Sequence, residues 1–173
     1  MAEPSWPSLI TWADLARGPL FRRLAPGAEA RMKIGRQLGL DALDRLEGEV
    51  EAMPWLDGAR LKGRFEADVR QTCGVTLEPL QSTLEGSFEV KLLPVGSPNA
   101  PEEPEEAVLD PEAEDPPDLV EGETIDLGAI LVEQLALDVD PFPRKPGAVF
   151  DPGPEERPAS PFAVLKDLKP KEP

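Results

Sequence analysis

The chain has 173 residues, of which 34 are Asp or Glu and 18 are Lys or Arg, giving a formal net charge of −16. It contains no histidine and one cysteine, which excludes Ser-His-Asp and Cys-His catalysis, an intramolecular disulfide and a Cys/His zinc site. No apolar run approaches the roughly 18 to 20 residues that span a membrane, and the N-terminus lacks a signal-peptide pattern. We therefore expect a cytoplasmic protein that binds partners and is not an enzyme.

The prolines and charges are unevenly distributed along the chain. Six of the 22 prolines precede residue 94 and sixteen lie in the last 80 residues, where they break regular structure. Residues 98–126 hold twelve acidic and no basic groups, whereas residues 1–40 hold six basic and three acidic groups. The well-packed part is therefore expected before residue 94 with one later helix, and the low pI is compatible with a local basic patch.

Short elements are predicted before residue 40. The pattern indicates an edge strand at 8–12, a helical turn at 13–16 and a strand at 20–24. A longer helix is predicted at 28–38, because Ala30, Ile34 and Leu38 recur at helical spacing and Gly39 follows.

Three long strands are predicted next from apolar and polar residues that alternate with a period of two. They cover 45–53, 60–75 and 84–93, and a helical turn at 41–44 is expected before the first. Pro54, Asp57 and Gly58 indicate a connection of about six residues, and Pro79 is assigned to the next connection. Solvent faces that run acidic, basic and acidic favour an antiparallel meander with cross-strand charge pairs.

The segment 94–118 consists mainly of Pro, Glu and Asp and is expected to be a mobile insertion. It is either a solubilising loop, an acidic mimic of nucleic acid or a docking arm for a basic protein. A helix is predicted within 124–139, with Asp126 as its N-cap. Its apolar stripe comprises Leu127, Ile130, Leu131, Gln134 and Leu135, widened by Leu137.

The C-terminal part is expected to be extended, since three prolines lie within 140–147. Ser160 and Pro161 indicate the start of a short helix that places Phe162, Leu165 and Leu168 on one side. This helix either docks on the domain or binds a partner protein.

The predicted fold class is α+β: an antiparallel sheet meander packed with two or three helices, with an acidic mobile insertion and an extended C-terminal tail. Residues 1–93 form the N-terminal helix and sheet, 94–118 the disordered insertion, and 119–147 complete the same domain. Residues 148–173 form a flexible tail with the short terminal helix.

Basic residues in the N-terminal third and on one strand face are the candidate nucleic-acid contacts: Arg22, Arg23, Arg31, Lys33, Arg36, Arg60, Lys62 and Arg64. The alternative is a solvated strand face whose cations pair with neighbouring carboxylates. Cys73 falls on the apolar side of its strand and is interpreted as an inert core thiol.

Several ordered motifs resemble the YceD family of large ribosomal RNA subunit accumulation proteins. They are Arg36–Leu40, Gln71-Thr-Cys-Gly-Val-Thr-Leu-Glu-Pro79, Gly86–Pro94, Ile125–Leu137, Asp140-Pro-Phe-Pro-Arg-Lys-Pro-Gly147 and Ser160–Leu168. The version here is similar to the alphaproteobacterial branch. Many relatives carry Cys-x-x-Cys where this chain has Cys73-Gly-Val-Thr76, so a second metal or redox ligand is missing.

The resemblance implies a non-enzymatic role in large-subunit biogenesis, with no cofactor, metal, membrane or small-molecule substrate. The expected partner is large-subunit ribosomal RNA or its precursor particle, contacted by the basic residues. A ribosomal or RNA-processing protein is a further possible partner. The second hypothesis is an adaptor or chaperone that holds a basic ribosomal protein through the acidic segment and Phe162, Leu165 and Leu168.

Overall fold

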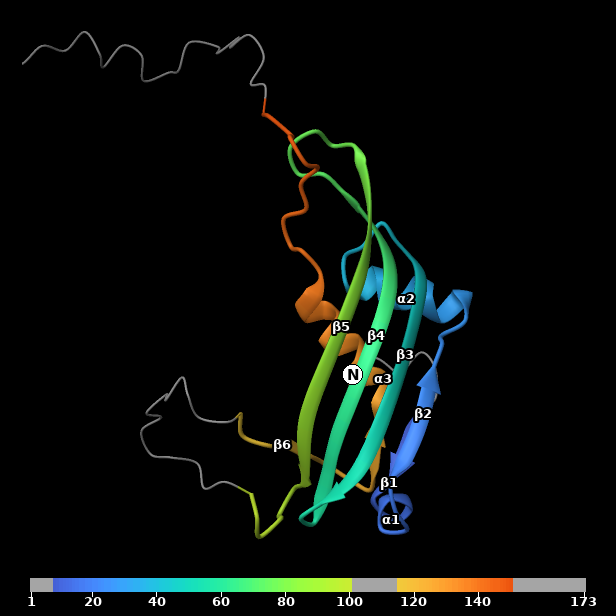
Figure 1. Ribbon diagram of the computed structural model, residues 1–173, viewed down its shortest axis with the longest axis vertical. Coiled ribbons are helices and arrows are strands. Elements are labelled where there is room, and N and C mark those ends of the chain that lie inside the picture. Colours follow the sequence, from blue (N-terminus) through green and yellow to red (C-terminus); the bar gives the residue numbers. More distant parts are fainter. Residues whose placement is uncertain (1–7, 101–114, 151–173) are drawn as a thin grey trace, which may run out of the picture.

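The computed structural model of the protein describes residues 8–100 and 115–150 (Figure 1). The strands are β1 (Leu9–Thr11), β2 (Leu20–Leu24), β3 (Ala42–Trp55), β4 (Gly58–Thr72), β5 (Pro79–Pro94), β6 (Asp118–Val120) and β7 (Thr124–Asp126). The helices are α1 (Trp12–Leu15), α2 (Ala28–Gln37) and α3 (Leu127–Asp138). The terminal helix predicted around Phe162, Leu165 and Leu168 lies outside the described residues.

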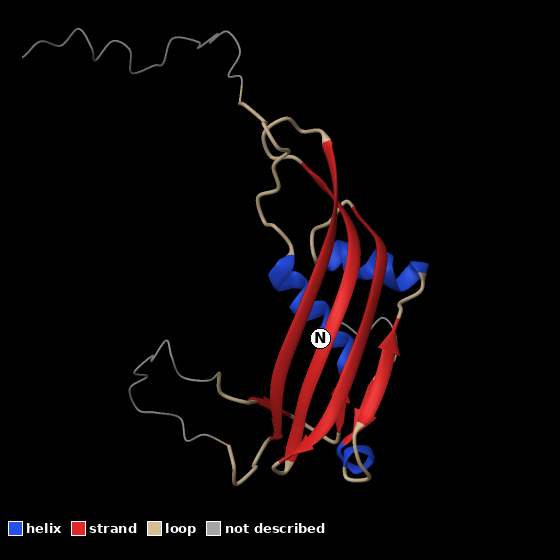
Figure 2. Cartoon of the chain, in the orientation of Figure 1, coloured by secondary structure: helices blue, strands red, loops and turns tan. Residues whose placement is uncertain are grey.

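Five strands form one sheet in the order β2-β3-β4-β5-β6, and α2 and α3 lie against one of its faces (Figure 2). The neighbouring strands β2, β3, β4 and β5 pair antiparallel, which is the predicted meander, and the α+β class is confirmed. Two features of the sheets were not predicted: β6 pairs parallel to β5, and β1 pairs with β7 in a second, two-stranded sheet. The face of the large sheet that faces the helices is called the inner face, and the opposite one the outer face.

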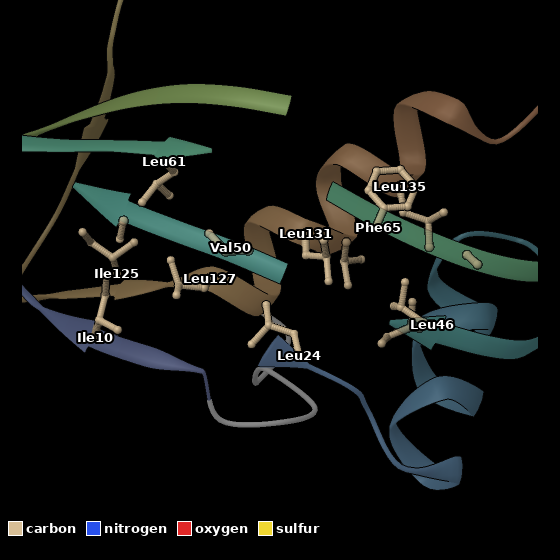
Figure 3. Packing of buried hydrophobic residues seen from close by; sticks show 14 of the residues in the cluster. Ile10, Leu24, Leu46, Val50, Leu61, Phe65, Ile125, Leu127, Leu131 and Leu135 are labelled. Carbon is tan, nitrogen blue, oxygen red and sulfur yellow. The ribbon is translucent and has the colours of Figure 1, made fainter. Parts of the chain in front are cut away.

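The inner face carries the apolar half of each alternating pattern. Leu46 and Val50 of β3 and Leu61 and Phe65 of β4 are buried, and they meet Leu127, Leu131 and Leu135 of α3 (Figure 3). Charged residues occupy the alternate positions, so one layer of helices suffices to exclude water from the core.

Glycines allow large side chains to lie against the sheet. A Cβ at Gly63 would lie 2.3 Å from the ring of Phe88, which stands opposite it in β5, and one at Gly86 would lie 2.4 Å from the ring of Phe65. A Cβ at Gly48 would lie 2.6 Å from Leu131 of α3. These positions therefore accept helix α3 and the two rings only because they lack a side chain.

Helix α3 begins where the two sheets meet. Asp126 is its N-cap, as predicted, and its carboxylate accepts hydrogen bonds from the backbone N–H groups of Gly128 at 2.9 Å and Ala129 at 3.1 Å. The Ser8 hydroxyl donates to the same carboxylate at 3.0 Å. The beginning of the described chain is thus joined to the start of its last helix.

Several predicted boundaries were wrong. The expected helical turn at 41–44 is strand, because β3 starts at Ala42, and the connection from β3 to β4 comprises only Leu56 and Asp57. Leu56 adopts a φ of 54°, which lets so short a turn close. Pro79 is the first residue of β5 rather than part of the connection. The first position of a strand tolerates a proline.

Other corrections concern element ends and faces. Trp12 opens α1 instead of closing β1, and β4 ends at Thr72 rather than running to Val75. Leu137 does not widen the buried stripe of α3, since its side chain is 75% exposed. Residues 140–147 contain no helix or strand, as the prolines predicted.

The acidic segment is described at both of its ends. After Pro94 the chain turns, and Ser97 and Asn99 donate hydrogen bonds to the Asp57 carboxylate at 2.9 and 2.8 Å. The chain is described again from Asp115, and β6 begins at Asp118. The expected insertion at 94–118 therefore includes ordered turn residues at one end and a strand residue at the other.

Candidate functional site

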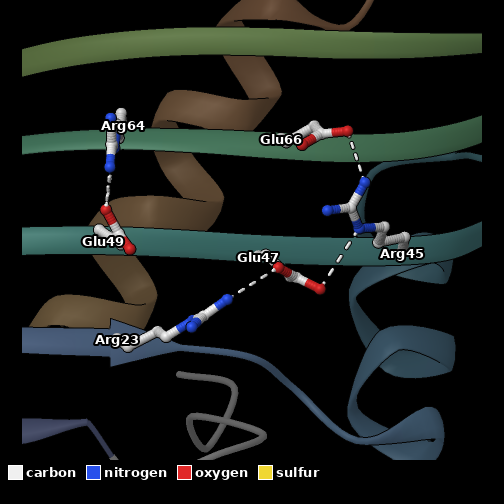
Figure 4. Close-up of polar contacts among 6 residues, drawn as sticks. All are labelled: Arg23, Arg45, Glu47, Glu49, Arg64 and Glu66. Atoms are coloured by element: carbon white, nitrogen blue, oxygen red, sulfur yellow. Dashed lines mark hydrogen bonds and ion pairs between the residues drawn. The ribbon is translucent and has the colours of Figure 1, made fainter.

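The outer face of the sheet carries a network of ion pairs (Figure 4). Arg64 contacts Glu49 at 2.5 Å, and Arg23 contacts Glu47 at 3.4 Å. Arg45 joins Glu47 at 3.3 Å to Glu66 of β4 at 2.5 Å. Hydrogen bonding and charge from Arg45 lower the pKa of Glu47, so this carboxylate stays ionised at neutral pH.

Three further cations of β4, Arg60, Lys62 and Arg70, are also paired. Arg60 and Lys62 of β4 share Glu89 of β5, with Lys62 at 3.2 Å, and the Arg60 hydrogen bond is the main cause of a lowered pKa at Glu89. Arg70 contacts Asp44 at 2.7 Å. The cross-strand pairing expected as the alternative interpretation of this face is present for Arg60, Lys62 and Arg64.

An exposed aromatic side chain stands beside these cations. Phe21 of β2 lies opposite Glu51 of β3, which places it on the outer face, and it is 60% exposed. It lines a shallow hollow of about 360 Å³ with Lys62 and Arg64, and Arg23 projects from the same face of β2. Phe21, Arg23, Lys62 and Arg64 are called the Phe21 surface.

Sequence reasoning missed Phe21 as a site residue. The available signal was the alternation within Leu20–Leu24. Leu20 and Leu24 point inward, so Phe21, at an odd position, points to the opposite face together with Arg23. In a strand of five residues that signal is too short to separate an exposed aromatic residue from a core one.

The other predicted cations lie elsewhere. Arg22 stands opposite the buried Val50, so it points to the inner side at the sheet border. Arg31, Lys33 and Arg36 are on α2, which packs on the inner face through Ala30 and Ile34. Arg31 donates to the Pro26 carbonyl at 2.8 Å, Lys33 pairs with Glu29 at 3.1 Å and Arg36 contacts the sulfur of Met32. The eight candidate residues therefore lie on two sides of the sheet instead of one surface.

Cys73 follows β4 in a turn with an unusual electrostatic environment. The thiol is fully buried, and its sulfur accepts hydrogen bonds from the backbone N–H groups of Lys145 at 3.4 Å and Thr76 at 3.5 Å. Hydrogen bonding from the Thr76 side chain, then from these backbone groups, lowers the pKa of Cys73 to about 6 although burial raises it. The sequence predicted the burial of Cys73 but not the lowered pKa of its thiol.

The turn is closed by the segment that follows α3. Gly74 donates its N–H to the Pro143 carbonyl at 2.9 Å, and Lys145 pairs with Glu78 at 3.0 Å. Thr76 is the last residue of the Cys73-Gly-Val-Thr76 motif, and its hydroxyl donates to Glu78 at 3.1 Å. Among residues 8–100 and 115–150, no group of three Cys, Asp or Glu side chains is arranged to hold a metal ion.

No helix in the described part of the chain is long and apolar enough to cross a membrane. No curated protein and no solved structure gives a significant match to the chain. The sequence profile of one family, described as "Large ribosomal RNA subunit accumulation protein YceD", matches residues 61–169. The match spans β4, β5, the acidic segment, α3 and the Cys73 turn, which is more than half of the chain. The chain therefore belongs to the YceD family of large ribosomal RNA subunit accumulation proteins.

Proposed function

We propose that this protein is a non-enzymatic cytoplasmic factor in biogenesis of the large ribosomal subunit. In this proposal it supports the synthesis, processing or stability of large-subunit ribosomal RNA by contacting the RNA or its precursor particle through the Phe21 surface. The observation that carries the proposal is an exposed phenylalanine ring on an open sheet face, in a hollow that it shares with Lys62 and Arg64 as well as Glu49 and Glu51. Arg23 lies on the same face of β2. An aromatic platform with neighbouring cations suits single-stranded RNA, whose bases stack while its phosphates are neutralised.

Ion pairing on this face limits the affinity but does not block the contact. The Arg23 and Arg64 side chains are 68% and 76% exposed, and exposed pairs are worth only about 0 to 1 kcal/mol. A phosphate can therefore replace Glu47 or Glu49 as the partner at little cost. The carboxylates stay on the face and repel the backbone, so binding is expected to be weak and sensitive to salt.

The second group of cations extends the proposed contact. Arg22 points from β2 to the inner side of the sheet, and Arg31, Lys33 and Arg36 are on α2, which packs on that inner face. RNA that passes over the β2 border from the Phe21 surface meets them next. Arg60, adjoining Lys62 at Glu89, extends the contact in the other direction.

The test compares Phe21→Ala and Arg64→Glu with matched control variants. Phe142→Ala removes another exposed phenylalanine, and Arg70→Glu breaks an ion pair at the other end of β4. Association of the tagged protein with large-subunit precursor particles is measured by sedimentation, and RNA contacts by ultraviolet crosslinking. Each test variant is expected to lower association about tenfold, because stacking of one base is worth roughly 1 to 3 kcal/mol. Association unchanged from the controls would refute the Phe21 surface as the contact.

The second candidate function is an acidic adaptor or chaperone for a basic ribosomal protein without RNA contact. The acidic composition of residues 98–126 and the carboxylates near β5 favour it. Deletion of residues 101–114 leaves β5 and β6 in place and discriminates between the two functions. An adaptor that works through this segment loses its protein partner, whereas an RNA-binding protein retains its RNA or binds it more tightly.

A further inference from the structure

One border of the large sheet is open over most of its length. Strand β5 pairs with β4 from Pro79 to Leu92, but on its other side β6 pairs only with Leu92–Pro94. From Pro79 to Lys91 no strand of the described residues covers this side, and β5 forms the border of the long strands in Figure 1. Every second residue of such an edge directs its backbone N–H and C=O away from the sheet, where another strand can pair with them.

Two prolines keep β6 from covering the edge itself. The parallel register sets Asp118 beside Leu92, so an upstream extension of β6 would place Pro117 and Pro116 next along β5. Proline has no N–H to donate to the ladder, and consecutive prolines end a strand. The open edge is therefore a consequence of the sequence immediately before β6.

Partly exposed apolar side chains lie on the inner face beside the open edge. The inward-facing side chains of β5, among them Leu84, Phe88 and Val90, are only half buried, whereas those of β4 are fully buried. A hollow of about 580 Å³ lies between β5 and α3 and is lined by Val90, Gln134 and the exposed Leu137. An added strand would cover these apolar atoms with every second side chain.

The charges around the edge are mostly negative. Asp115, Asp118 and Glu89 line the same hollow together with the cations Arg60 and Lys91. Asp138 of α3 lies close under Gly86 of β5. Glu85 stands directly opposite Glu66 in the β4–β5 pair, and Glu66 is already paired with Arg45, so Glu85 lacks a cation directly across the strand pair. On the outer face the Lys91 ammonium lies 5.6 Å from the centre of the Trp55 ring. This cation of β5 therefore already has a cation–π contact. Carboxylates outnumber cations along the edge, and this excess favours a cationic strand.

We propose that the edge of β5 from Pro79 to Lys91 binds an extended, basic segment of another protein, which adds to the sheet as a strand. Backbone hydrogen bonds supply the pairing, apolar side chains at alternate positions cover Phe88 and Leu137, and Lys or Arg side chains between them meet Glu85 and the neighbouring carboxylates. The proposal locates the adaptor function and does not depend on the RNA contact.

The same charges disfavour two other occupants. A second copy of β5 would bring another Glu85 and Glu89 to the junction, where like charges oppose pairing. The chain's own residues 101–114 contain seven acidic and no basic groups, so they lack the charge that this edge attracts.

The test measures binding of short synthetic peptides to the full chain by fluorescence anisotropy. The probe is Arg-Val-Lys-Val-Arg-Leu-Lys, and its controls are Glu-Val-Glu-Val-Glu-Leu-Glu and Arg-Pro-Lys-Pro-Arg-Pro-Lys, which keeps the charge but cannot form a strand. The probe is expected to bind at least about tenfold more tightly than either control, because only it offers both a basic charge and strand hydrogen bonds. Amide hydrogen exchange is expected to slow within 80–91 and not along β2.

Variants locate the site. Glu85→Lys and Leu137→Gln are each expected to weaken probe binding about fivefold or more, and Glu85→Lys keeps the fold because it removes a like-charge pair with Glu66. Glu51→Lys makes the same charge change at an exposed position of β3 and is expected to leave probe binding within twofold of the unchanged protein. Leu137→Gln is expected to keep RNA crosslinking, whereas Phe21→Ala is expected to keep probe binding, so failure of one proposal is distinguishable from failure of the other. Glu85→Lys is not used for this comparison, because Glu85 lines a hollow with Arg23 and Arg64 of the Phe21 surface.

Four results would overturn the proposal. The first is a proline peptide that binds as tightly as the probe, and the second is an equal effect of Glu85→Lys and Glu51→Lys on probe binding. The third is a dimer of the free protein that pairs through β5. The fourth is slow exchange, without peptide, of the amides within 80–91 that point away from the sheet. The last two results would assign the edge to a second copy or to the chain's own residues 101–114.

Discussion

Cys73 shows how a few backbone groups alter the chemistry of one residue. Burial in apolar surroundings raises the pKa of a thiol, but donors directed at the sulfur stabilise its anion. Here the Thr76 side chain and the N–H groups of Thr76 and Lys145 prevail, and the pKa falls to about 6. The Thr76 hydroxyl also lies 3.1 Å from Glu78, so its single proton serves two acceptors.

We predict that the thiolate absorbance of the folded protein titrates with a midpoint near the pKa of about 6, and that Thr76→Val moves this midpoint upward. The signal is unambiguous because the chain has one cysteine. The folded state binds the proton less tightly than the unfolded chain, so this group adds stability as pH rises from about 6 to about 9 and loses it as pH falls through 6. Cys73→Ser should abolish that pH dependence. A midpoint at the ordinary thiol value in both the unchanged protein and Thr76→Val would contradict the prediction.

At the scale of elements, the position of α3 is decided by what the sheet lacks. Leu131 lies against Gly48, and Asp138 lies against Gly86, with separations that leave no room for a Cβ at either glycine. The N-cap at Asp126 sets where the helix begins, and the two glycines set how closely it approaches.

Gly48→Ala is predicted to destabilise the protein by about 1 to 3 kcal/mol, because the new methyl group overpacks against Leu131. Gly74→Ala is the control, since a Cβ there meets only the Pro143 carbonyl at an ordinary 3.8 Å. Urea unfolding followed by circular dichroism measures both free energies. Equal stability of the two variants would show that α3 shifts away from the sheet without loss.

For the whole molecule, the small sheet joins distant parts of the chain. Strand β1 pairs with β7, and Ser8 hydrogen-bonds Asp126 at the start of α3. The buried Ile10 and Ile125 face each other in this pair and extend the core of the large sheet. The N-terminal segment is thus part of the surface on which α3 is seated.

Ile10→Ala is therefore predicted to lower stability by about 2 to 5 kcal/mol, through the lost burial and the cavity it leaves. The neighbouring Leu9 is 52% exposed, and Leu9→Ala is expected to change stability by no more than about 0.5 kcal/mol. Thermal unfolding of both variants checks the contrast. A loss of no more than about 0.5 kcal/mol in both variants would mean that β1 contributes through its backbone pairing alone.

The alternating patterns of β3, β4 and β5 and the capped helix α3 were predictable because local periodicity and capping encode them. The helical turn expected at 41–44 was not strand-like in sequence; pairing of Ala42 and Leu43 with β4 overrode its local preference. The candidate site was predictable only in composition. Adjacent residues of a strand point to opposite faces, but only the pairing of β2 with β3 shows that Phe21 is on the outer face and Arg22 on the inner one.

The sequence by itself determined the α+β class, the faces of the long strands, the cap of α3 and the family, since each depends on residues that are close in the chain or on ordered motifs. The tertiary structure was needed to show which cations are ion-paired, that Phe21 lies exposed on the outer face, and that no strand of the described residues covers β5 from Pro79 to Lys91. Those properties depend on strand order and register, which are set by contacts between residues far apart in the chain.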